Sequence, residues 1–350
     1  MPVTDGLDQL ESRFRIWERE RHLSGGVLVT QAGSTLFEGS YGFADRSSGS
    51  PVTPRTRFGL ASFTKMFTAV VVCDLVAVAA LKFDTAIVDV LPPDRRPSTL
   101  DSQVTVHHLL THTSGIADYA EEAEDSPRYL ADYGELWVDR PSYRMERPGD
   151  FLPLFSDLEP YRPPGQRWQY SNAGFIMLGL VIEEITGRPY TEVVQERVFD
   201  RAGMGASGFF RLDEARADVA VGYLPDRSPD GHWRSNIYMI PVIGGADGGA
   251  FSTTHDLDQF LRCYADGTLL GPVQTVALTR HADAGHGFHS GYGVLHYPDA
   301  SYGHGGGDPG VEVLVRRFPD QDAHVIVLCN GEGLAGEVRD SILEALRFET

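Results

Sequence analysis

Apolar residues near the start of the chain recur at helical spacing between charged residues, which predicts an amphipathic helix. These apolar positions are Leu7, Leu10, Phe14 and Trp17. Two glycines at positions 25 and 26 end the helical pattern. Residues 27–31 and 35–38 are apolar segments on either side of a glycine-containing turn, so they predict a β-hairpin, with residues 41–45 as a candidate third strand.

Longer apolar runs in the middle of the chain predict buried helices. We expect helices over residues 66–81, 104–112, 172–186 and 191–201, with Thr191 as the cap of the last one, and a further helix around residues 257–264. Residues 116–165 are acidic, aromatic and proline-rich without clear periodicity. Long irregular segments in compact domains are usually functional, so we expect this one to form a wall of a binding site.

Strand patterns return near the end of the chain, at residues 292–297, 311–318 and 324–330, and a last helix is expected over residues 336–348. Short turns join the strands, which makes them antiparallel. The pattern therefore predicts an α/β (α+β) fold in which an antiparallel β-sheet is flanked by helices and a mostly helical lobe is inserted. We expect residues 1–60 and 247–350 to form the sheet lobe, and residues 61–246 the helical lobe.

Composition narrows the choice of partners. The chain has 49 acidic against 30 basic residues, a net charge of −19, which argues against nucleic acid or an anionic membrane as a partner. Its three cysteines show no C-x-x-C spacing, so they are expected to be core residues in a reducing compartment. Residues 1–23 contain no apolar run of the kind found in a signal peptide, and we expect a cytoplasmic protein. The sequence does not predict an oligomeric state.

Ser62 and Lys65 stand three positions apart at the start of the helix expected over residues 66–81. Side chains at this spacing share one helix face, so the serine can act as a nucleophile and the lysine as its base. Free backbone N–H groups at a helix N-terminus also suit a developing oxyanion. The spacing alone also fits a helix cap followed by a surface lysine.

Two further motifs make the chemistry more specific. Tyr170, Ser171 and Asn172 precede an apolar helix, and the run His304, Gly305, Gly306 and Gly307 precedes a predicted strand. In their order and separation the three motifs resemble those of the serine β-lactamase and penicillin-binding-protein-like family, in particular its class C β-lactamase-related branch. The resemblance covers most of the chain from residue 25 to residue 330, and it implies a β-lactamase/transpeptidase-like fold.

The resemblance implies a role for each residue of these motifs. Ser62 would be the acylated nucleophile, and Lys65 would accept its proton or lower the pKa of Tyr170 by its charge. Tyr170 would act as general base toward Ser62 and later toward the deacylating water. Asn172 would hold Lys65 and donate to the substrate, while the backbone N–H groups of Ser62 and Gly307 would form the oxyanion hole.

His304 stands where β-lactamases of this branch carry a lysine, so anchoring of a substrate carboxylate is less expected. Esterase-like and aminopeptidase-like relatives tolerate histidine there. We therefore expect a serine hydrolase that acts on a small-molecule ester or amide. The alternatives are an acyltransferase that uses the same intermediate, a DD-peptidase or β-lactamase, and a non-catalytic binding or sensor domain on this fold.

The substrate pocket is expected to draw on aromatic residues of the irregular segment and on the third motif. The candidates are Tyr119, Trp137, Phe151, Phe155, Gly305 and Gly306. No metal and no cofactor are expected. His108 and His112 are four apart, but no glutamate follows His108 as a zinc-binding H-E-x-x-H motif requires, so a helix-capping or core role is predicted for them.

Overall fold

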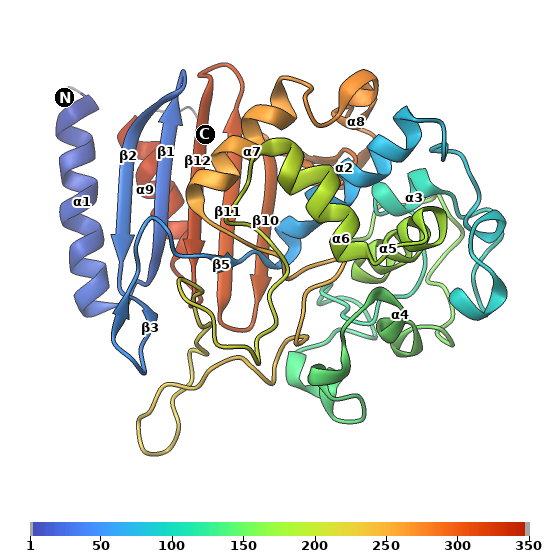
Figure 1. Ribbon diagram of the computed structural model, residues 1–350, viewed down its shortest axis with the longest axis horizontal. Coiled ribbons are helices and arrows are strands. Elements are labelled where there is room, and N and C mark those ends of the chain that lie inside the picture. Colours follow the sequence, from blue (N-terminus) through green and yellow to red (C-terminus); the bar gives the residue numbers. More distant parts are fainter. Residues whose placement is uncertain (1–2, 347–350) are drawn as a thin grey trace.

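An eight-stranded antiparallel sheet forms the centre of the computed structural model, which describes residues 3–346 (Figure 1). In spatial order the strands are β2 (Ser34–Tyr41), β1 (Gly25–Gln31), β12 (Ala323–Cys329), β11 (Val311–Phe318), β10 (Tyr302–Asp308), β9 (Leu295–His296), β8 (Phe288–Ser290) and β7 (Ala282–Gly285). Strand β1 pairs with β12 along its whole length, so strands from both ends of the chain lie side by side. The predicted fold class is thereby confirmed.

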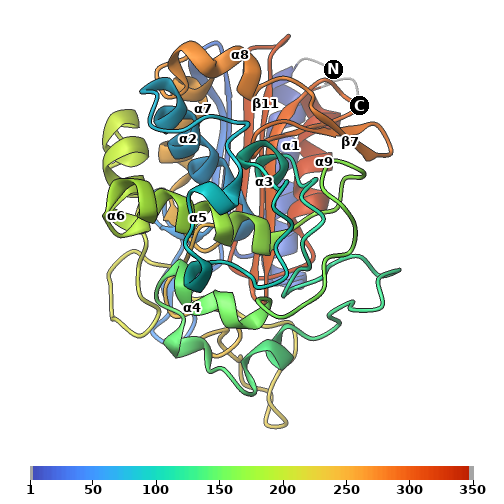
Figure 2. The same cartoon turned by 90° about the vertical axis from the view of Figure 1, so that its right-hand side faces the viewer.

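Alternation of side chains along the strands gives the sheet two buried faces. On one face Val27 and Val29 of β1 pack with α1 (Val3–Glu20) and α9 (Ala335–Leu346), through residues such as Phe14 and Ile342. On the other face Leu28 belongs to the larger core. That core includes residues of α2 (Thr64–Ala77) and α7 (Thr254–Ala265), which cover the opposite side of the sheet in Figures 1 and 2.

The remaining helices gather beside α2, on the right-hand side of Figure 1. They are α3 (Val106–Leu110), α4 (Pro148–Phe151), α5 (Asn172–Thr186), α6 (Tyr190–Val194) with the π-helical η7 (Gln195–Asp200), and α8 (Gln274–Ala277). Short 3-10 helices occupy 61–63, 87–89, 93–95, 133–137, 142–144, 152–154 and 271–273. Two small sheets pair β3 (Phe43–Asp45) with β4 (Ser50–Pro51), and β5 (Phe58–Gly59) with β6 (Phe251–Ser252).

Several predicted elements are confirmed, among them α1, the first hairpin, α7, β11 and β12. Helix α5 has the predicted bounds, because Ser171 caps it and Gly187 ends it in the left-handed conformation. The three cysteines are free and buried, as expected. Helix α9 was expected to reach residue 348, which lies outside the described residues.

Other boundaries were wrong for local reasons. Helix α6 begins at Tyr190 after Pro189, whose fixed φ suits a helix start, so Thr191 is not its cap. Gly42, with a φ of 70°, separates β2 from β3, which pairs in its own small sheet. The strand expected over residues 292–297 shrinks to β9, because the chain turns at Gly293, where φ is 65°. Strands β7 and β8 were not predicted.

The glycine-rich motif was expected to precede a strand, but it is itself the strand β10. In the described part of the chain, no helix has the length and apolar character needed to cross a membrane. The expected cytoplasmic location and the lobe boundaries at residues 60/61 and 246/247 stay predictions.

Candidate active site

The turn that carries Ser62 has a strained backbone. The 3-10 helix η1 (Ala61–Phe63) leads into α2, and Ala61 has a φ of 44°, which residues other than glycine rarely adopt. The hydroxyl of Thr64 donates to the carbonyl of Ala61 at 2.8 Å and accepts from the N–H of Ala250 at 3.0 Å. These bonds hold the turn so that Ser62 stays partly exposed at the start of the helix.

Lys65 is fully buried one helical turn after Ser62. Its Nζ atom lies 3.0 Å from Ser62 Oγ, 2.7 Å from Asn172 Oδ1 and 2.6 Å from the backbone carbonyl oxygen of Asp247. Burial lowers the pKa of Lys65, and carboxylates nearby oppose this shift, that of Asp247 most strongly. The first two motifs therefore meet at one buried amine.

Tyr170 completes this group. Lys65 Nζ lies 4.9 Å from the centroid of the Tyr170 ring, whose other neighbours include His112 and His304. Burial raises the pKa of Tyr170 well above its usual value and Glu122 adds to the rise, whereas a hydrogen bond with Ser62 opposes it. The phenol therefore keeps its proton at neutral pH.

Asn172 is fixed by the start of α5. Its backbone N–H and that of Ala173 donate to the two carboxylate oxygens of Asp118, at 2.6 and 3.1 Å. Its side-chain amide donates to Glu122 Oε1 at 3.1 Å, which leaves Oδ1 turned to Lys65. Burial raises the pKa of Asp118 to about 7, although these backbone bonds act to lower it.

Strand β10 passes beside the Ser62 turn. A Cβ atom on Gly306 would lie 2.4 Å from the carbonyl oxygen of Leu60 and 3.0 Å from the backbone nitrogen of Ser62, so only glycine fits there. A Cβ on Gly307 would meet nothing within 4 Å, whereas one on Gly305 would contact Leu314 on β11. The third motif is therefore brought to the nucleophile, and Gly306 is its point of closest approach.

His304 is 3% exposed and stays neutral, because burial lowers its pKa to about 4 and the charge of Lys65 also lowers it. Its Nδ1 atom lies 2.5 Å from the carbonyl oxygen of Gly305, to which it donates. Its Nε2 atom is buried and has no hydrogen-bond partner in the described part of the chain. This nitrogen is thus left as an acceptor.

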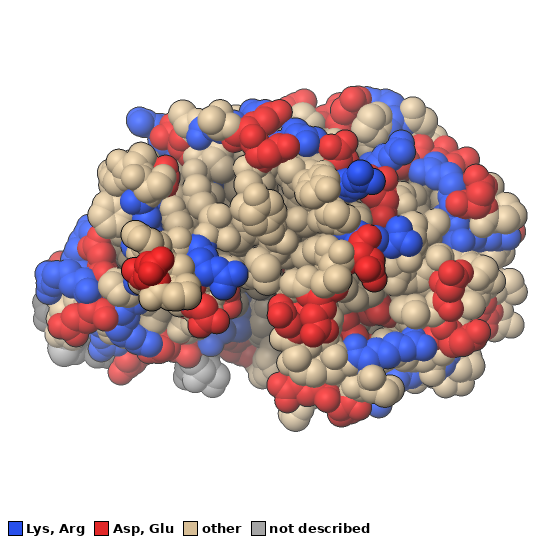
Figure 3. Space-filling view, turned by 90° about the horizontal axis from the view of Figure 1, so that it is seen from below, with Lys and Arg blue, Asp and Glu red and all other residues tan. Residues whose placement is uncertain are grey.

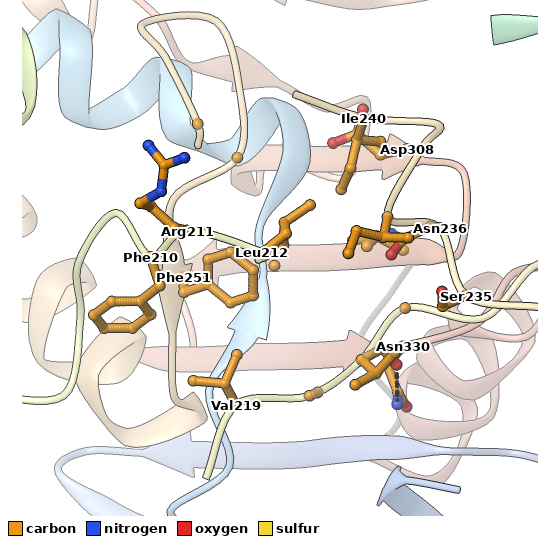
Figure 4. Close-up of a pocket in the computed structure, with 18 of the residues that line it drawn as sticks. Phe210, Arg211, Leu212, Val219, Ser235, Asn236, Ile240, Phe251, Asp308 and Asn330 are labelled. Carbon is orange, nitrogen blue, oxygen red and sulfur yellow. Dashed lines mark hydrogen bonds between the residues drawn. The ribbon is translucent and has the colours of Figure 1, made fainter. Parts of the chain in front are cut away.

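A cavity of about 880 Å³ lies next to this group (Figure 4). It reaches Ala61, which precedes Ser62, and Gly248, which lies beside Ala61, but Ser62 itself is not among its lining residues. Figure 4 shows Asp308 toward one side of the cavity and Val219 toward the other. Most of its apolar lining comes from residues 210–251, in particular Phe210, Leu212, Val219, Ile240 and Phe251.

The four aromatic residues expected to line the pocket fall into two pairs. Tyr119 and Phe151 line the cavity, and the Tyr119 hydroxyl donates to the carboxylate of Asp247. Trp137 and Phe155 do not line it: both are buried in the core, and the indole N–H of Trp137 donates to the backbone carbonyl of Met239 at 2.7 Å. Aromatic character alone did not distinguish lining residues from core residues.

The sequence analysis missed the acidic residues of the site, namely Asp118, Glu122, Asp247 and Asp308. Asp308 could have been found from strand alternation, because it lies two residues after Gly306 and therefore on the same face of β10. Asp247 reaches the site in a glycine-rich loop, where no periodicity marks it. Figure 3 views the molecule from the lower side of Figure 1, where acidic and basic side chains surround a central uncharged area.

His108 and His112 have structural roles. His108 completes the capping box of α3 with Thr105, and His112 is buried and accepts a hydrogen bond from the backbone of Ser171. The helix-capping or core role predicted for them is confirmed. Within residues 3–346, no group of three or more histidine, cysteine, aspartate or glutamate side chains is arranged to hold a metal ion.

Comparison with known proteins agrees with this geometry. The family model described as Beta-lactamase matches residues 7–347. A solved penicillin binding protein from Bacillus halodurans has a TM-score of 0.86 and 39% identity, covering 95% of this chain and 99% of that chain. Penicillin-binding protein 4 of Amycolatopsis lactamdurans is 26% identical over 339 residues, 92% of this chain and 84% of that protein. Esterase EstB of Burkholderia gladioli is 36% identical over 216 residues, 60% of this chain and 53% of that protein. This chain therefore belongs to the beta-lactamase family, whose members are serine hydrolases of this fold.

Proposed function

We propose that this protein hydrolyses a small-molecule ester or amide through an acyl intermediate on Ser62. The observation that carries the proposal is the environment of Lys65. Two of its three neighbours, Asn172 Oδ1 and the Asp247 carbonyl, can only accept hydrogen bonds. When the amine of Lys65 is neutral, it donates its two N–H groups to these oxygens, and its lone pair then faces Ser62 Oγ, which lies 3.0 Å from Nζ and accepts from the protonated form. Burial, which lowers the pKa of Lys65, favours this neutral form.

In the first half of this reaction, Ser62 is acylated. Lys65 takes the proton of Ser62 while Oγ bonds to the substrate carbonyl carbon, and the negative charge on the carbonyl oxygen is met by the N–H groups of Ser62 and Gly307. When the bond to the leaving group breaks, the proton passes from Lys65 to the departing alcohol or amine. Water repeats these steps on the acyl ester and releases the acid.

Tyr170 enters this scheme as a neutral phenol that relays a proton to the leaving group. Burial and Glu122 both raise its pKa, which opposes a role as a free phenolate base in the resting enzyme. Of the two roles considered for Lys65, direct acceptance of the Ser62 proton is therefore the better supported. Tyr170 still lies beside both Lys65 and Ser62, where a relay is needed.

The choice of an ester or amide over a β-lactam rests on His304. Because its pKa is lowered to about 4, it offers no positive charge to a substrate carboxylate at neutral pH. Of the three relatives described above, one is named as an esterase and two as penicillin-binding proteins, so the names alone allow both activities. The neutral histidine favours the esterase-like or amidase-like alternative.

The test is intact-protein mass spectrometry after incubation with a small activated ester, a fluorophosphonate or a penicillin. We expect an adduct from the first two reagents on the wild type and none on Ser62→Ala, with little or no adduct from the penicillin. A folded wild-type protein that forms no adduct with any reagent would contradict the proposal. A dominant penicillin adduct would instead favour a penicillin-binding activity.

A further inference from the structure

Gly306 shows which face of β10 looks toward the nucleophile. A Cβ atom on Gly306 would point at Leu60 and Ser62. Because side chains alternate along a strand, His304 and Asp308 share this face and flank the nucleophile on its two sides. His304 lies near Tyr170, with 6.2 Å between ring centroids. Asp308 is four residues further on, about 13 Å at the usual rise of a strand.

The positions of His304 and Asp308 indicate which end of the site binds each part of the substrate. In the proposed reaction Tyr170 serves the leaving group, so the His304 end of β10 is the leaving-group side. The Asp308 end borders the cavity, which also contains Tyr119, Tyr133 and Asp247. Asp308 directly follows Gly307, the proposed oxyanion donor. A substrate group bound by Asp308 therefore lies within a few bonds of the scissile carbonyl, on its acyl side.

The polar atoms on this face of β10 are hydrogen-bond acceptors without donors. The buried Nε2 atom of His304 has no partner within residues 3–346. Asp308 is half-buried and lines the cavity, and its carboxylate takes part in no hydrogen bond or ion pair with the residues that the structure describes. A buried polar atom is normally paired, so the unpaired Nε2 atom indicates a ligand that donates at the His304 end, while the Asp308 carboxylate faces the cavity and is free to accept from the same ligand.

The excess of negative charge around the site also favours a ligand that donates hydrogen bonds. The carboxylates that act to raise the pKa of Lys65 include Asp247, Glu122, Asp118 and Asp308. The arginines that line the cavity do not balance them. Arg211 already pairs with Glu146 and Asp213, and Arg216 pairs with Glu214. Burial, with the nearby Asp247 adding to it, raises the pKa of Asp308 to about 7, and the charge of Lys65 opposes this rise.

We propose that the substrate carries an ammonium group on its acyl part, close to the scissile ester or amide, and that Asp308 and Asp247 bind this group. The apolar remainder of the acyl part occupies the cavity between Phe151 and Ile240. Asp247 can contribute because the Tyr119 hydroxyl occupies only one of its carboxylate oxygens. This inference rests on the proposed function, since it defines the substrate class of the same site.

The test measures how well two amides protect Ser62 from labelling by a fluorophosphonate. One is leucinamide, assayed as each enantiomer, and the other is 2,4-dimethylpentanamide, in which a methyl group replaces the ammonium group. A charge-assisted hydrogen bond predicts that at least one enantiomer of leucinamide protects at about tenfold or more lower concentration than the neutral amide. In Asp308→Asn, which keeps the shape of the side chain, we expect the ratio to fall to about threefold or less.

Asp320→Asn is the matched control, because Asp320 is exposed in the turn between β11 and β12 and the change removes the same charge. The ratio should stay at its wild-type value there. Equal protection by the two amides, or an unchanged ratio in Asp308→Asn, would overturn the inference while leaving the Ser62 chemistry intact. If the wild type were not labelled at all, the proposed function would fail by itself, and isothermal titration calorimetry with the same two amides would decide on the ammonium site.

Discussion

The imidazole ring of His112 stacks on the phenol ring of Tyr170, with ring centroids 4.6 Å apart and an angle of 26° between the planes. The same imidazole accepts a hydrogen bond at Nδ1 from the backbone N–H of Ser171, at 3.1 Å. His112 is buried, and its φ of 57° lies in the left-handed region. One side chain thus positions both the ring of Tyr170 and the backbone that follows it.

Two substitutions separate these contacts. Asparagine tolerates the left-handed backbone and can accept from Ser171, so His112→Asn should fold but lose the stacking. We expect kcat to fall by about tenfold with little change in KM, since the loss concerns a proton-relaying group rather than substrate binding. His112→Phe keeps a ring but leaves the Ser171 N–H unsatisfied, which should lower the free energy of unfolding by about 1–3 kcal/mol.

Steady-state kinetics and urea unfolding of the two variants check this prediction. His255→Asn is the control, because His255 is an exposed histidine whose ring contacts Glu38 rather than the site. A His112→Asn protein with the kcat of the wild type would show that the stacking does not position Tyr170.

Gly306→Ala tests the contact between β10 and the nucleophile turn. The added Cβ would lie 2.4 Å from the Leu60 carbonyl oxygen, so the backbone of one segment must move. We expect a loss of about 1–3 kcal/mol in unfolding free energy and a drop of about a hundredfold in the rate of Ser62 acylation. Gly336→Ala in α9, where the new Cβ meets nothing within 4 Å, should change neither quantity appreciably. Acylation at the wild-type rate in Gly306→Ala would contradict the geometric argument.

The elements that the sequence predicted well are those with strong periodicity and clear end signals. Helix α5 has Ser171 before it and Gly187 after it, β11 has valine at alternate positions from Val311 to Val315, and β12 has an apolar run from Val325 to Cys329. Strand β10 has neither feature. Four of its seven residues are glycine, and its strand conformation comes from pairing with β11, a contact that local sequence does not reveal.

The same distinction applies to the site. Ser62, Lys65, Tyr170 and Asn172 were found because short motifs with chemical meaning mark them. Asp118 and Asp308 carry no such mark, and their effect depends on burial that arises only in the folded chain. The cavity wall over residues 210–251 lacks periodicity, and it meets the N-terminal part of the chain only because the chain folds back, as the bridge between Arg57 and Val219 illustrates.

Asp308 should also reveal itself in the pH dependence of stability. A carboxyl group whose folded pKa exceeds its unfolded value stabilises the fold at low pH and loses that contribution as the pH rises through the folded value. The pKa of Asp308 is raised from 3.8 to about 7 by burial, Asp247, Glu122 and Glu332, against the opposing charge of Lys65. Its ionisation should therefore destabilise the wild type as the pH rises from about 4 to about 7, with no further change above that range.

Asp308→Asn removes this titration. Relative to the wild type, we expect its free energy of unfolding to rise by about 1–3 kcal/mol between about pH 5 and about pH 8. Urea unfolding at the two pH values measures the difference, and Asp320→Asn should show none. A constant difference for Asp308→Asn would mean that the carboxylate is better compensated than its surroundings indicate.

The pH dependence of the Ser62 acylation rate should follow the pKa of Lys65. In the proposed mechanism the reaction needs a neutral amine, so the acylation rate rises with pH through the pKa of Lys65, which burial moves below its usual 10.5. His304 adds no rising limb near neutral pH, because its pKa is about 4, and the raised pKa of Tyr170 keeps the phenol protonated throughout this range. The rising limb is therefore assigned to Lys65, while the carboxyl groups of Asp118 and Asp308, whose pKa values are raised to about 7, ionise in the same range and shift the limb through their charge.

Asp247→Asn tests in which direction the rising limb of the pH–rate profile moves. The carboxylate of Asp247 raises the pKa of Lys65, while the backbone carbonyl that binds Nζ is unaffected by the substitution. Removing the charge should lower the pKa of Lys65 and move the rising limb to lower pH. Stopped-flow acylation by a fluorogenic ester across the pH range measures the shift, with Asp320→Asn as the control that leaves the limb in place. A limb that moved to higher pH, or that did not move, would indicate that Lys65 acts as a fixed positive charge and that another group accepts the Ser62 proton.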